Sequence, residues 1–293
     1  TLPAWQPRER ILRGSRVSNL KNLDVHFEFG KNWSSYSKLI DEERIGSSID
    51  GMKKLLGDDG VAGKRFLDIG CGSGIHSLAA LLLGAREVVA TDLDPDSVKT
   101  TESVLAQHDS GTLRQVMEVS VFDLPEVFPK RFDVVYSWGV LHHTGAMFEA
   151  IRSAAAMVAP GGLFAFALYR KTPYCRFWRA EKKWYSRAGQ WQQKAARALY
   201  VLAFRMACRV TGRNFKTYIA EYKKMRGMEF FHDVHDWLGG YPYESISPLQ
   251  VDDLLCSLGF VLERRFVRSG WNNVLGSGCD EFVYRRKSED ASL

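Results

Sequence analysis

The sequence predicts an α/β fold in which a seven-stranded, mostly parallel sheet carries helices on both faces. Short β-branched runs alternate with helix-like stretches between residues 65 and 169, which is the pattern of successive β-α-β units. A glycine-rich turn directly follows the first of these runs. Two more strand-like runs stand near the end of the chain, after a long helical insert that follows the fifth strand.

The first five strands are expected in one continuous stretch of the chain. Their predicted positions are 65–69, 87–92, 113–119, 132–138 and 163–169. Helices are expected between them near residues 74–83, 95–107 and 146–158. Pro160-Gly161-Gly162 is expected to separate the last of these helices from the fifth strand, because proline and glycine punctuate regular structure.

After Tyr169 the pattern becomes helical, basic and aromatic up to about residue 236, with Gly189 and Gly212 as expected breaks. A loop rich in glycine and proline over 239–248 follows. A helix over 249–258 and two strands over 260–267 and 280–286 then complete the expected sheet.

The chain therefore divides into four expected parts. Residues 1–60 form an N-terminal helical cover, 61–170 the core sheet with its helices, 171–247 the basic and aromatic insert, and 248–293 the last helix and two strands.

Charge is unevenly distributed along the 293 residues. The net charge is +6, but residues 171–226 hold 15 Lys and Arg against two acidic residues, a balance of 15 − 2 = +13. The rest of the chain therefore sums to 6 − 13 = −7. The insert also carries 11 aromatic residues, so its charge calls for a functional or structural reason.

The cysteines and the apolar runs indicate the compartment. Five scattered cysteines without a C-x-x-C pair favour reduced thiols over a disulfide framework or a zinc site. No apolar run approaches the 18 residues that a membrane span needs, and the first residues lack the layout of a secretory signal. A cytoplasmic protein without a bound metal is expected.

The first strand and its turn read R-F-L-D-I-G-C-G-S-G over residues 65–74. Glycine adopts positive φ and lacks a Cβ, so the chain can turn tightly while its backbone approaches a ligand. The helix that follows presents free N–H groups. Asp92 ends the second strand, where nucleotide-binding folds place an acidic residue on ribose hydroxyls. The two features together predict a nucleotide-type cofactor, and on this evidence NAD competes with S-adenosylmethionine (SAM).

These segments resemble a known family. L-D-I-G-C-G-S-G is similar to motif I of class I SAM-dependent methyltransferases, and V-V-A-T-D-L-D-P to their second motif. F-D-V-V-Y-S-W-G-V-L-H-H resembles their fourth motif in the style of the UbiE/UbiG-like (methyltransferase type 11/12) group, and V-A-P-G-G-L-F-A-F their fifth strand. The resemblance implies a Rossmann-like core, SAM as methyl donor and S-adenosylhomocysteine (SAH) as product. It covers residues 65–168 well and the remainder poorly.

The resemblance also implies roles for matching residues. Asp68 would orient the loop and the donor amino group, the backbone of the loop glycines would hold the methionine part, and Asp92 would accept the ribose hydroxyls. Ser120 stands where the family often has Asp, so its hydroxyl and the Val121 N–H would contact adenine, with Asp123 as the substitute. The complete donor set is Asp68, Gly70, Gly72, Gly74, Asp92, Leu93, Ser120, Val121, Ser137 and Trp138.

A hydroxyl acceptor needs a group that takes its proton. His142 and His143 follow the fourth strand directly, at the edge of the sheet where ligands bind in such folds. His142 is the leading candidate base and His143 the second. The alternative is that the pair only shapes the loop.

A second cluster, F-H-D-V-H-D-W-L-G-G-Y-P-Y-E over 231–244, joins the insert to the core. Its acids and histidines could pair as base and orienter, with Asp236 as a catalytic candidate, or could bind a divalent metal. The expected acceptor pocket takes its residues from this cluster and from the N-terminal cover: Trp33, Tyr36, His232, His235, Trp237, Tyr241 and Tyr243. A structural turn with solvated charges is the alternative.

Three functions remain open for the basic insert. It could bind RNA such as tRNA through residues 171–226, contact a membrane surface, or form a lid over a small acceptor. The alternative to all three is a helical cap whose charges are only solvated. The lid is favoured, because the 231–244 cluster adjoins it. The favoured function is SAM-dependent O-methylation of a small metabolite such as a sugar or quinol. The alternatives are a tRNA methyltransferase, an NAD-linked oxidoreductase and a non-catalytic SAM-binding protein. The sequence does not determine the oligomeric state.

Overall fold

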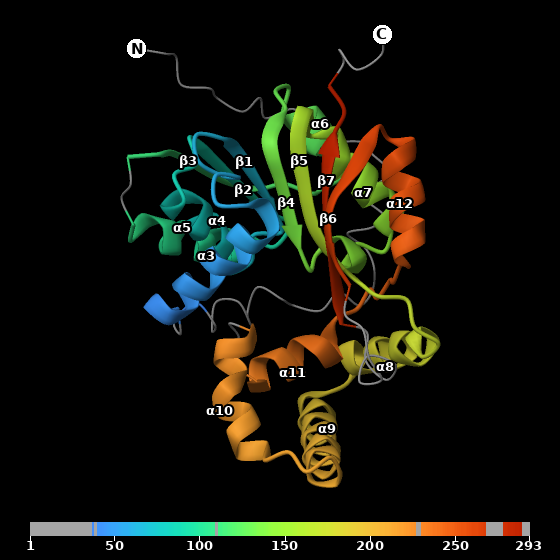
Figure 1. Ribbon diagram of the computed structural model, residues 1–293. Helices are drawn as coiled ribbons and strands as arrows, with labels where there is room; N and C mark the ends of the chain where they lie inside the picture. Colours follow the sequence, from blue (N-terminus) through green and yellow to red (C-terminus); the bar gives the residue numbers. More distant parts are fainter. Residues whose placement is uncertain (1–36, 38–39, 109–110, 227–229, 268–277, 289–293) are drawn as a thin grey trace.

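The computed structural model describes residues 37, 40–108, 111–226, 230–267 and 278–288. Its centre is a seven-stranded sheet with the order β3-β2-β1-β4-β5-β7-β6 (Figure 1). The first five strands run parallel, and β7 is antiparallel to both of its neighbours. The expected fold class is confirmed, including a helical insert between β5 and the last two strands.

The strands lie close to their predicted positions. They are β1 (Arg65–Ile69), β2 (Glu87–Asp92), β3 (Leu113–Glu118), β4 (Phe132–Trp138), β5 (Val158–Tyr169), β6 (Phe260–Phe266) and β7 (Cys279–Arg286).

The expected turn at residues 160–162 is wrong, because these residues lie inside β5. The pairing of β4 with β5 shifts register between Phe132 and Val134, so this stretch forms an irregularity within the ladder. A Cβ at Gly162 would lie 2.9 Å from the Asp133 carbonyl oxygen, so glycine is needed here for close approach of two strands.

Helices cover the sheet on both faces. One face packs against α3 (Glu42–Leu56), α4 (Ile75–Leu82) and α5 (Pro95–Ala106), and Leu56, Leu78 and Val104 share its core. The other face packs against α6 (Leu124–Val127), α7 (Met147–Ala156) and α12 (Pro248–Ser257). Adjacent residues of β1 point to opposite cores, Phe66 to the first and Leu67 to the second, as the alternation of a strand requires.

Helix α3 is the part of the expected N-terminal cover that the structure describes. Asp41 caps it by accepting a hydrogen bond from the Arg44 N–H at 3.0 Å, and Met52 and Leu55 are buried. Trp33 and Tyr36, which we expected in the acceptor pocket, lie outside the described residues.

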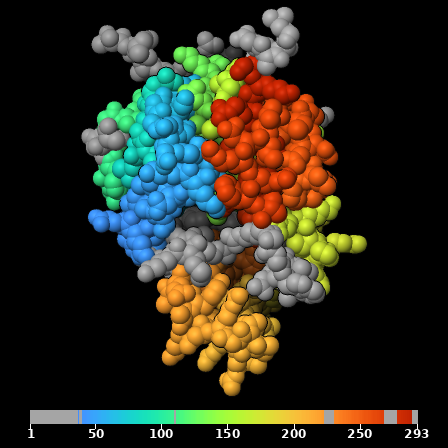
Figure 2. Space-filling model, viewed as in Figure 1, coloured from blue at the N-terminus to red at the C-terminus, as the bar shows by residue number. Residues whose placement is uncertain are grey.

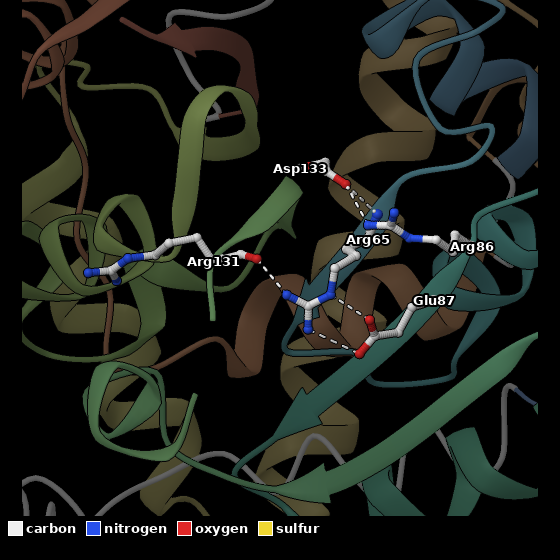
Figure 3. Close-up of polar contacts among 5 residues, drawn as sticks. All are labelled: Arg65, Arg86, Glu87, Arg131 and Asp133. Atoms are coloured by element: carbon white, nitrogen blue, oxygen red, sulfur yellow. Dashed lines mark hydrogen bonds and ion pairs between the residues drawn. The ribbon is translucent and has the colours of Figure 1, made fainter. Parts of the chain in front are cut away.

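Polar contacts join the amino ends of three adjacent strands (Figure 3). The Arg65 guanidinium donates to both carboxylate oxygens of Glu87 and to the Arg131 carbonyl. The Arg65 N–H donates to the Asp133 carboxylate at 2.8 Å, and Arg86 approaches the same carboxylate at 3.4 Å. These contacts connect β1, β2 and β4 at one end of the sheet, and the opposite ends of the strands carry the candidate site.

The insert forms four helices beyond the carboxyl ends of the parallel strands (Figure 1). They are α8 (Cys175–Arg187), α9 (Gln190–Val210), α10 (Phe215–Arg226) and α11 (Phe230–Gly239). They share a small core of their own that includes Tyr185, Tyr222 and Phe230. The expected breaks are confirmed, since Gly189 caps α9 and Gly212 follows it with φ 68°. No helix of the part that the structure describes is long and apolar enough to cross a membrane.

Candidate active site

The loop between β1 and α4 carries three glycines with positive φ: Gly70 at 74°, Gly72 at 53° and Gly74 at 78°. A Cβ at Gly70 would lie 2.4 Å from the Val140 side chain, and one at Gly74 would lie 2.9 Å from the Thr101 backbone. Both positions therefore need glycine for conformation and for space. The contact with Val140 also places this loop beside the segment that leads from β4 to the histidine pair.

Asp68 lies beneath the loop at the carboxyl end of β1 and is buried. The Ser77 hydroxyl on α4 donates to its carboxylate at 2.6 Å. Burial raises the pKa of Asp68 to about 7, although the Ser77 hydrogen bond opposes the increase. The side chain therefore ties the start of α4 to β1 and fixes the geometry of the loop.

Asp92 stands at the end of β2 and is partly buried. Its carboxylate accepts hydrogen bonds from the Gly72 N–H at 3.0 Å and the Asp94 N–H at 2.9 Å. Burial raises its pKa to about 6, while these backbone hydrogen bonds oppose the increase. A carboxylate offers about four acceptor positions, so a pair of ribose hydroxyls can bind beside the backbone groups.

The remaining expected donor residues lie around this loop. Leu93 is 38% exposed, whereas Ser120 and Val121 are buried at the end of β3. The Ser137 hydroxyl donates to the Ile69 carbonyl at 3.1 Å, so it joins β4 to the glycine loop. Trp138 packs against His76 with ring centroids 5.8 Å apart. The structure thus brings the described donor candidates to the carboxyl ends of β1 to β4.

His143 is held in one orientation by the insert. Its Nδ1 lies 2.8 Å from the Pro242 carbonyl oxygen. Because a carbonyl only accepts, Nδ1 carries the hydrogen, and Nε2 is the basic nitrogen of the neutral ring. A Cβ at Gly240 would lie 2.7 Å from His143 Cε1, so the glycine makes room for the ring.

His142 is fully buried beside it. Its ring lies 4.3 Å from the His143 ring and 3.8 Å from the Tyr169 ring, between centroids. Neither ring nitrogen has a hydrogen-bond partner among the described residues. Burial lowers the pKa of His142 well below its usual value, and the charges of His143 and Lys182 lower it further. His142 is therefore a neutral imidazole in the wall of the site.

Aromatic rings continue this wall into the insert. Tyr169 at the end of β5 contacts Trp237 and Tyr243 with ring centroids 5.5 and 5.3 Å away. The buried ammonium of Lys182 lies 3.7 Å from the centre of the Trp237 ring and donates to the Trp237 carbonyl. Burial lowers the pKa of Lys182, and the nearby Glu181 opposes the decrease. A cation over aromatic faces here joins α8 to α11.

The 231–244 cluster separates into two groups. Asp233 accepts a hydrogen bond from Tyr222 on α10, and His235 Nδ1 lies 2.8 Å from both the Tyr185 hydroxyl and the Arg197 guanidinium. These contacts join helices of the insert to one another. His232 lies on the same helix, α11, as Asp233 and His235. Burial lowers the pKa of His235 to about 4, and the Arg197 charge adds to the decrease.

The other group lies toward the sheet. Trp237 and Tyr243 belong to the aromatic wall, and Tyr241 precedes Pro242 through a cis peptide bond. Burial raises the pKa of the Tyr169 and Tyr185 hydroxyls, and the Asp236 charge makes a small further contribution in the same direction. Among residues that the structure describes, no group of three or more His, Cys, Asp or Glu is arranged to hold a metal ion.

Three residues of the site were not identified from the sequence. Tyr169 could have been found, because it ends a strand at the ligand-binding edge of the sheet. Lys182 and Trp178, whose ring lies 5.3 Å from the Trp237 ring between centroids, are four residues apart on α8. A lysine on the aromatic face of a helix was the available signal.

A separate surface cleft of about 770 Å³ lies between α3 and α5 and is lined by residues such as Asp41, Asp96 and His108. None of its lining residues belongs to the glycine loop or to the ends of β4 and β5. It is therefore distinct from the site described above.

Comparison with known proteins agrees with this arrangement. A family described as methyltransferase domain matches residues 40–222, which is more than half of the chain. The chain belongs to this family, and the expectation of a class I SAM-dependent methyltransferase is confirmed.

Curated proteins with similar sequences include O-methyltransferases. Residues of this chain are 34% identical over 114 positions to the ubiquinone biosynthesis O-methyltransferase of Pseudomonas savastanoi pv. phaseolicola, covering 39% of this chain and 48% of the relative. The protein of that name from Pseudomonas syringae pv. tomato is 35% identical over 113 positions, with 39% and 47% covered. The chain thus spans about half the length of the curated relatives it matches.

Solved structures share the fold. The magnesium protoporphyrin IX methyltransferase of Synechocystis PCC 6803 aligns with a TM-score of 0.50 and 15% identity, over 84% of each chain. An O-methyltransferase family protein from Burkholderia thailandensis aligns with a TM-score of 0.50 and 16% identity, over 82% of this chain and 55% of that one. At these identities the likeness concerns the fold alone.

Proposed function

We propose that this protein transfers the methyl group of SAM to a hydroxyl group of a small molecule, and that His143 takes the hydroxyl proton. The observation that carries the proposal is the 2.8 Å contact between His143 Nδ1 and the Pro242 carbonyl oxygen. It makes Nε2 the basic nitrogen of a side chain that follows β4, three residues after Val140, whose side chain lies against the glycine loop.

The residues around the glycine loop fit the donor. The Asp92 carboxylate is suited to the ribose hydroxyls, and the loop backbone with the start of α4 is suited to the methionine part. When SAM is bound, it supplies a methyl group that is already activated by a positive sulfur. The protein therefore needs to bind, align and exclude water, and the buried Asp68 and Ser137 hold the loop rigid for that task.

A proton acceptor favours oxygen over nitrogen as the target. A hydroxyl oxygen is a weak nucleophile until its proton moves to a base, whereas a neutral amine already presents a lone pair. As the oxygen binds the methyl carbon, the carbon–sulfur bond breaks and its electron pair stays on sulfur. The hydroxyl proton passes to His143 Nε2 and then to solvent.

The aromatic lining of the acceptor side favours a small molecule. The wall consists of the neutral His142, Tyr169, Trp237 and Tyr243, packed ring against ring. Such a wall suits a flat apolar ring that carries the reacting hydroxyl. The names of the curated relatives, which are ubiquinone biosynthesis O-methyltransferases, support the same proposal.

The test uses paired acceptors and paired variants. The protein is incubated with SAM and hydroxylated aromatic and sugar compounds, together with the amino analogue of each, and methylated products are identified by mass spectrometry. We expect O-methyl products, and we expect His143→Asn to lower kcat by roughly 10²- to 10⁴-fold without changing SAH affinity. Exclusively N-methylated products, or full activity in His143→Asn, would contradict the proposal.

His142→Asn is the matched control, since it changes the neighbouring ring by the same substitution. We expect a smaller loss of turnover, because His142 is in the wall and does not carry the oriented base. A larger loss in His142→Asn than in His143→Asn would assign the base to His142.

A further inference from the structure

Helix α9 exposes large apolar side chains along one face. Trp191, Leu199, Leu202, Met206 and Val210 are 73%, 67%, 56%, 56% and 84% exposed. Their spacing in steps of three, four and eight places them along the solvent side of a helix. The opposite side of α9, which includes Phe204, packs on the core of the insert. We call these five residues the α9 face.

Cations accompany this face. Lys194, Arg205 and Arg209 are exposed on α9 near the apolar side chains. From residue 182 to residue 220 the chain contains nine Lys and Arg and no Asp or Glu, and all of these cations except Lys182 and Arg197 are exposed. The surface around the α9 face is thus apolar and positive.

Helix α8 repeats the arrangement. Phe177 and Trp184 are 60% and 49% exposed and lie seven residues apart on one side of the helix. Arg176, Lys183 and Arg187 are exposed beside them.

The α9 face lies at the end of the molecule away from the sheet. Figure 1 shows α9 beyond α8 and α11, and Figure 2 shows residues 190–226 projecting below the rest of the protein. A broad flat partner can therefore reach this end without displacing the core.

We propose that the α9 face binds the surface of a phospholipid bilayer that contains anionic lipids. A helix with aromatic and aliphatic side chains on one face and Lys and Arg beside them lies in the interface, with its apolar side among the acyl chains and its cations at the headgroups. This proposal goes beyond methyl transfer and does not depend on the identity of the acceptor.

The chemistry of the face favours lipid over two other partners. RNA would use the cations and aromatic rings, but it would leave Leu199, Leu202, Met206 and Val210 without an apolar environment. A second copy of the chain would bring Arg205 and Arg209 toward the same cations of its partner, and like charges repel. An anionic bilayer satisfies both the apolar and the positive groups.

The experiment measures sedimentation of the full chain with vesicles. One set contains equal parts of phosphatidylglycerol and phosphatidylcholine, and the other contains phosphatidylcholine alone. We expect binding to the anionic vesicles at least 10-fold stronger than to the neutral ones, with a decrease as salt rises. We expect Leu202→Gln/Met206→Gln to weaken binding at least 10-fold, and Arg205→Glu/Arg209→Glu to remove the preference for anionic lipid.

The control is Leu113→Gln/Leu249→Gln, which changes two leucines on β3 and α12 that are even more exposed than Leu202 and Met206. This variant is expected to bind vesicles like the unmodified protein, and circular dichroism verifies the fold of every variant. Equal binding by the α9 variant and the control would overturn the proposal. The proposal would also be overturned if the unmodified protein did not bind vesicles. It would be overturned equally if the protein bound RNA or formed a dimer through this face, and the α9 variant abolished that binding or dissociated that dimer.

Discussion

The carboxylate of Asp92 is expected to control donor affinity, and Asp92→Asn tests this directly. In the structure the carboxylate accepts hydrogen bonds from the Gly72 and Asp94 N–H groups and can accept the ribose hydroxyls. The amide of Asn retains one accepting oxygen but replaces the other with a donor, and it carries no charge. A hydrogen bond to a charged group contributes about 1.5–3 kcal/mol.

The expected loss follows from these values. Losing one charge-assisted hydrogen bond and weakening the other costs roughly 2–3 kcal/mol, which is about a 30- to 160-fold weaker Kd. Calorimetric titration with SAH measures this without knowledge of the acceptor. Asp94→Asn is the matched control: Asp94 caps α5 by accepting from the Asp96 N–H at 2.8 Å, and Asn is an equally good cap. An SAH affinity within threefold of the unmodified protein for Asp92→Asn would refute the assignment.

The same carboxylate predicts how donor binding depends on pH. Burial raises the pKa of Asp92 to about 6, above the ordinary 3.8. Ribose hydroxyls donate to the ionised form, so SAH binding is expected to be full above pH 7 and to fall as the pH drops through 6. At pH 5 the affinity should be about 10-fold lower. The effect of pH on folding stability has the opposite sign, because the raised pKa of Asp92 means that the native state favours the protonated carboxyl. The contribution of Asp92 to the free energy of unfolding is therefore fully present below pH 3.8 and is lost as the pH rises through 6.

Two other predictions concern the acceptor side and the stability of the sheet. Gly240→Ala places a Cβ 2.7 Å from His143 Cε1, so the ring must move by about 3.4 − 2.7 = 0.7 Å. We expect kcat to fall roughly 10- to 100-fold while SAH affinity stays unchanged. Gly51→Ala is the control: the space around its Cβ is open, so this variant should keep full activity. Unchanged turnover in Gly240→Ala would exclude His143 as the positioned base. Asp280→Asn removes the buried negative charge that pairs with Arg170 and should lower the free energy of unfolding by about 3–5 kcal/mol in denaturant titration. A change below 1 kcal/mol would show that water solvates this pair in solution.

Most of the sheet was predictable because its signals are local. β1, β2 and β4 begin and end where the apolar runs and their flanking residues indicate. The start of β5 was not predictable, because a glycine that allows two strands to approach has the same local sequence as a glycine that makes a turn. Only the position of Gly162 against Asp133 distinguishes the two cases.

The two sides of the candidate site differ in the same way. The donor residues from Asp68 to Ser137 lie at or just after the carboxyl ends of successive strands, so the topology of the sheet brings them together. The aromatic wall joins Tyr169 to Lys182, Trp237 and Tyr243 through the packing of the insert, and no sequence spacing specifies that contact. The insert was therefore recognisable as basic and aromatic, whereas the division of its side chains between wall, internal core and surface required the structure.

This division has a consequence for how the two binding functions are coupled. The contacts that hold the donor loop come from β1, β2, β4 and α4. The orientation of the His143 ring, in contrast, is fixed by the carbonyl of Pro242, which belongs to the insert. Changes in α8 or α11 should therefore alter acceptor use while donor affinity stays constant. The exception is Val140, which contacts Gly70 on one side and leads into the histidine pair on the other. A change at Val140 should disturb both sides at once, because the shape of the donor loop and the position of the base meet at that side chain.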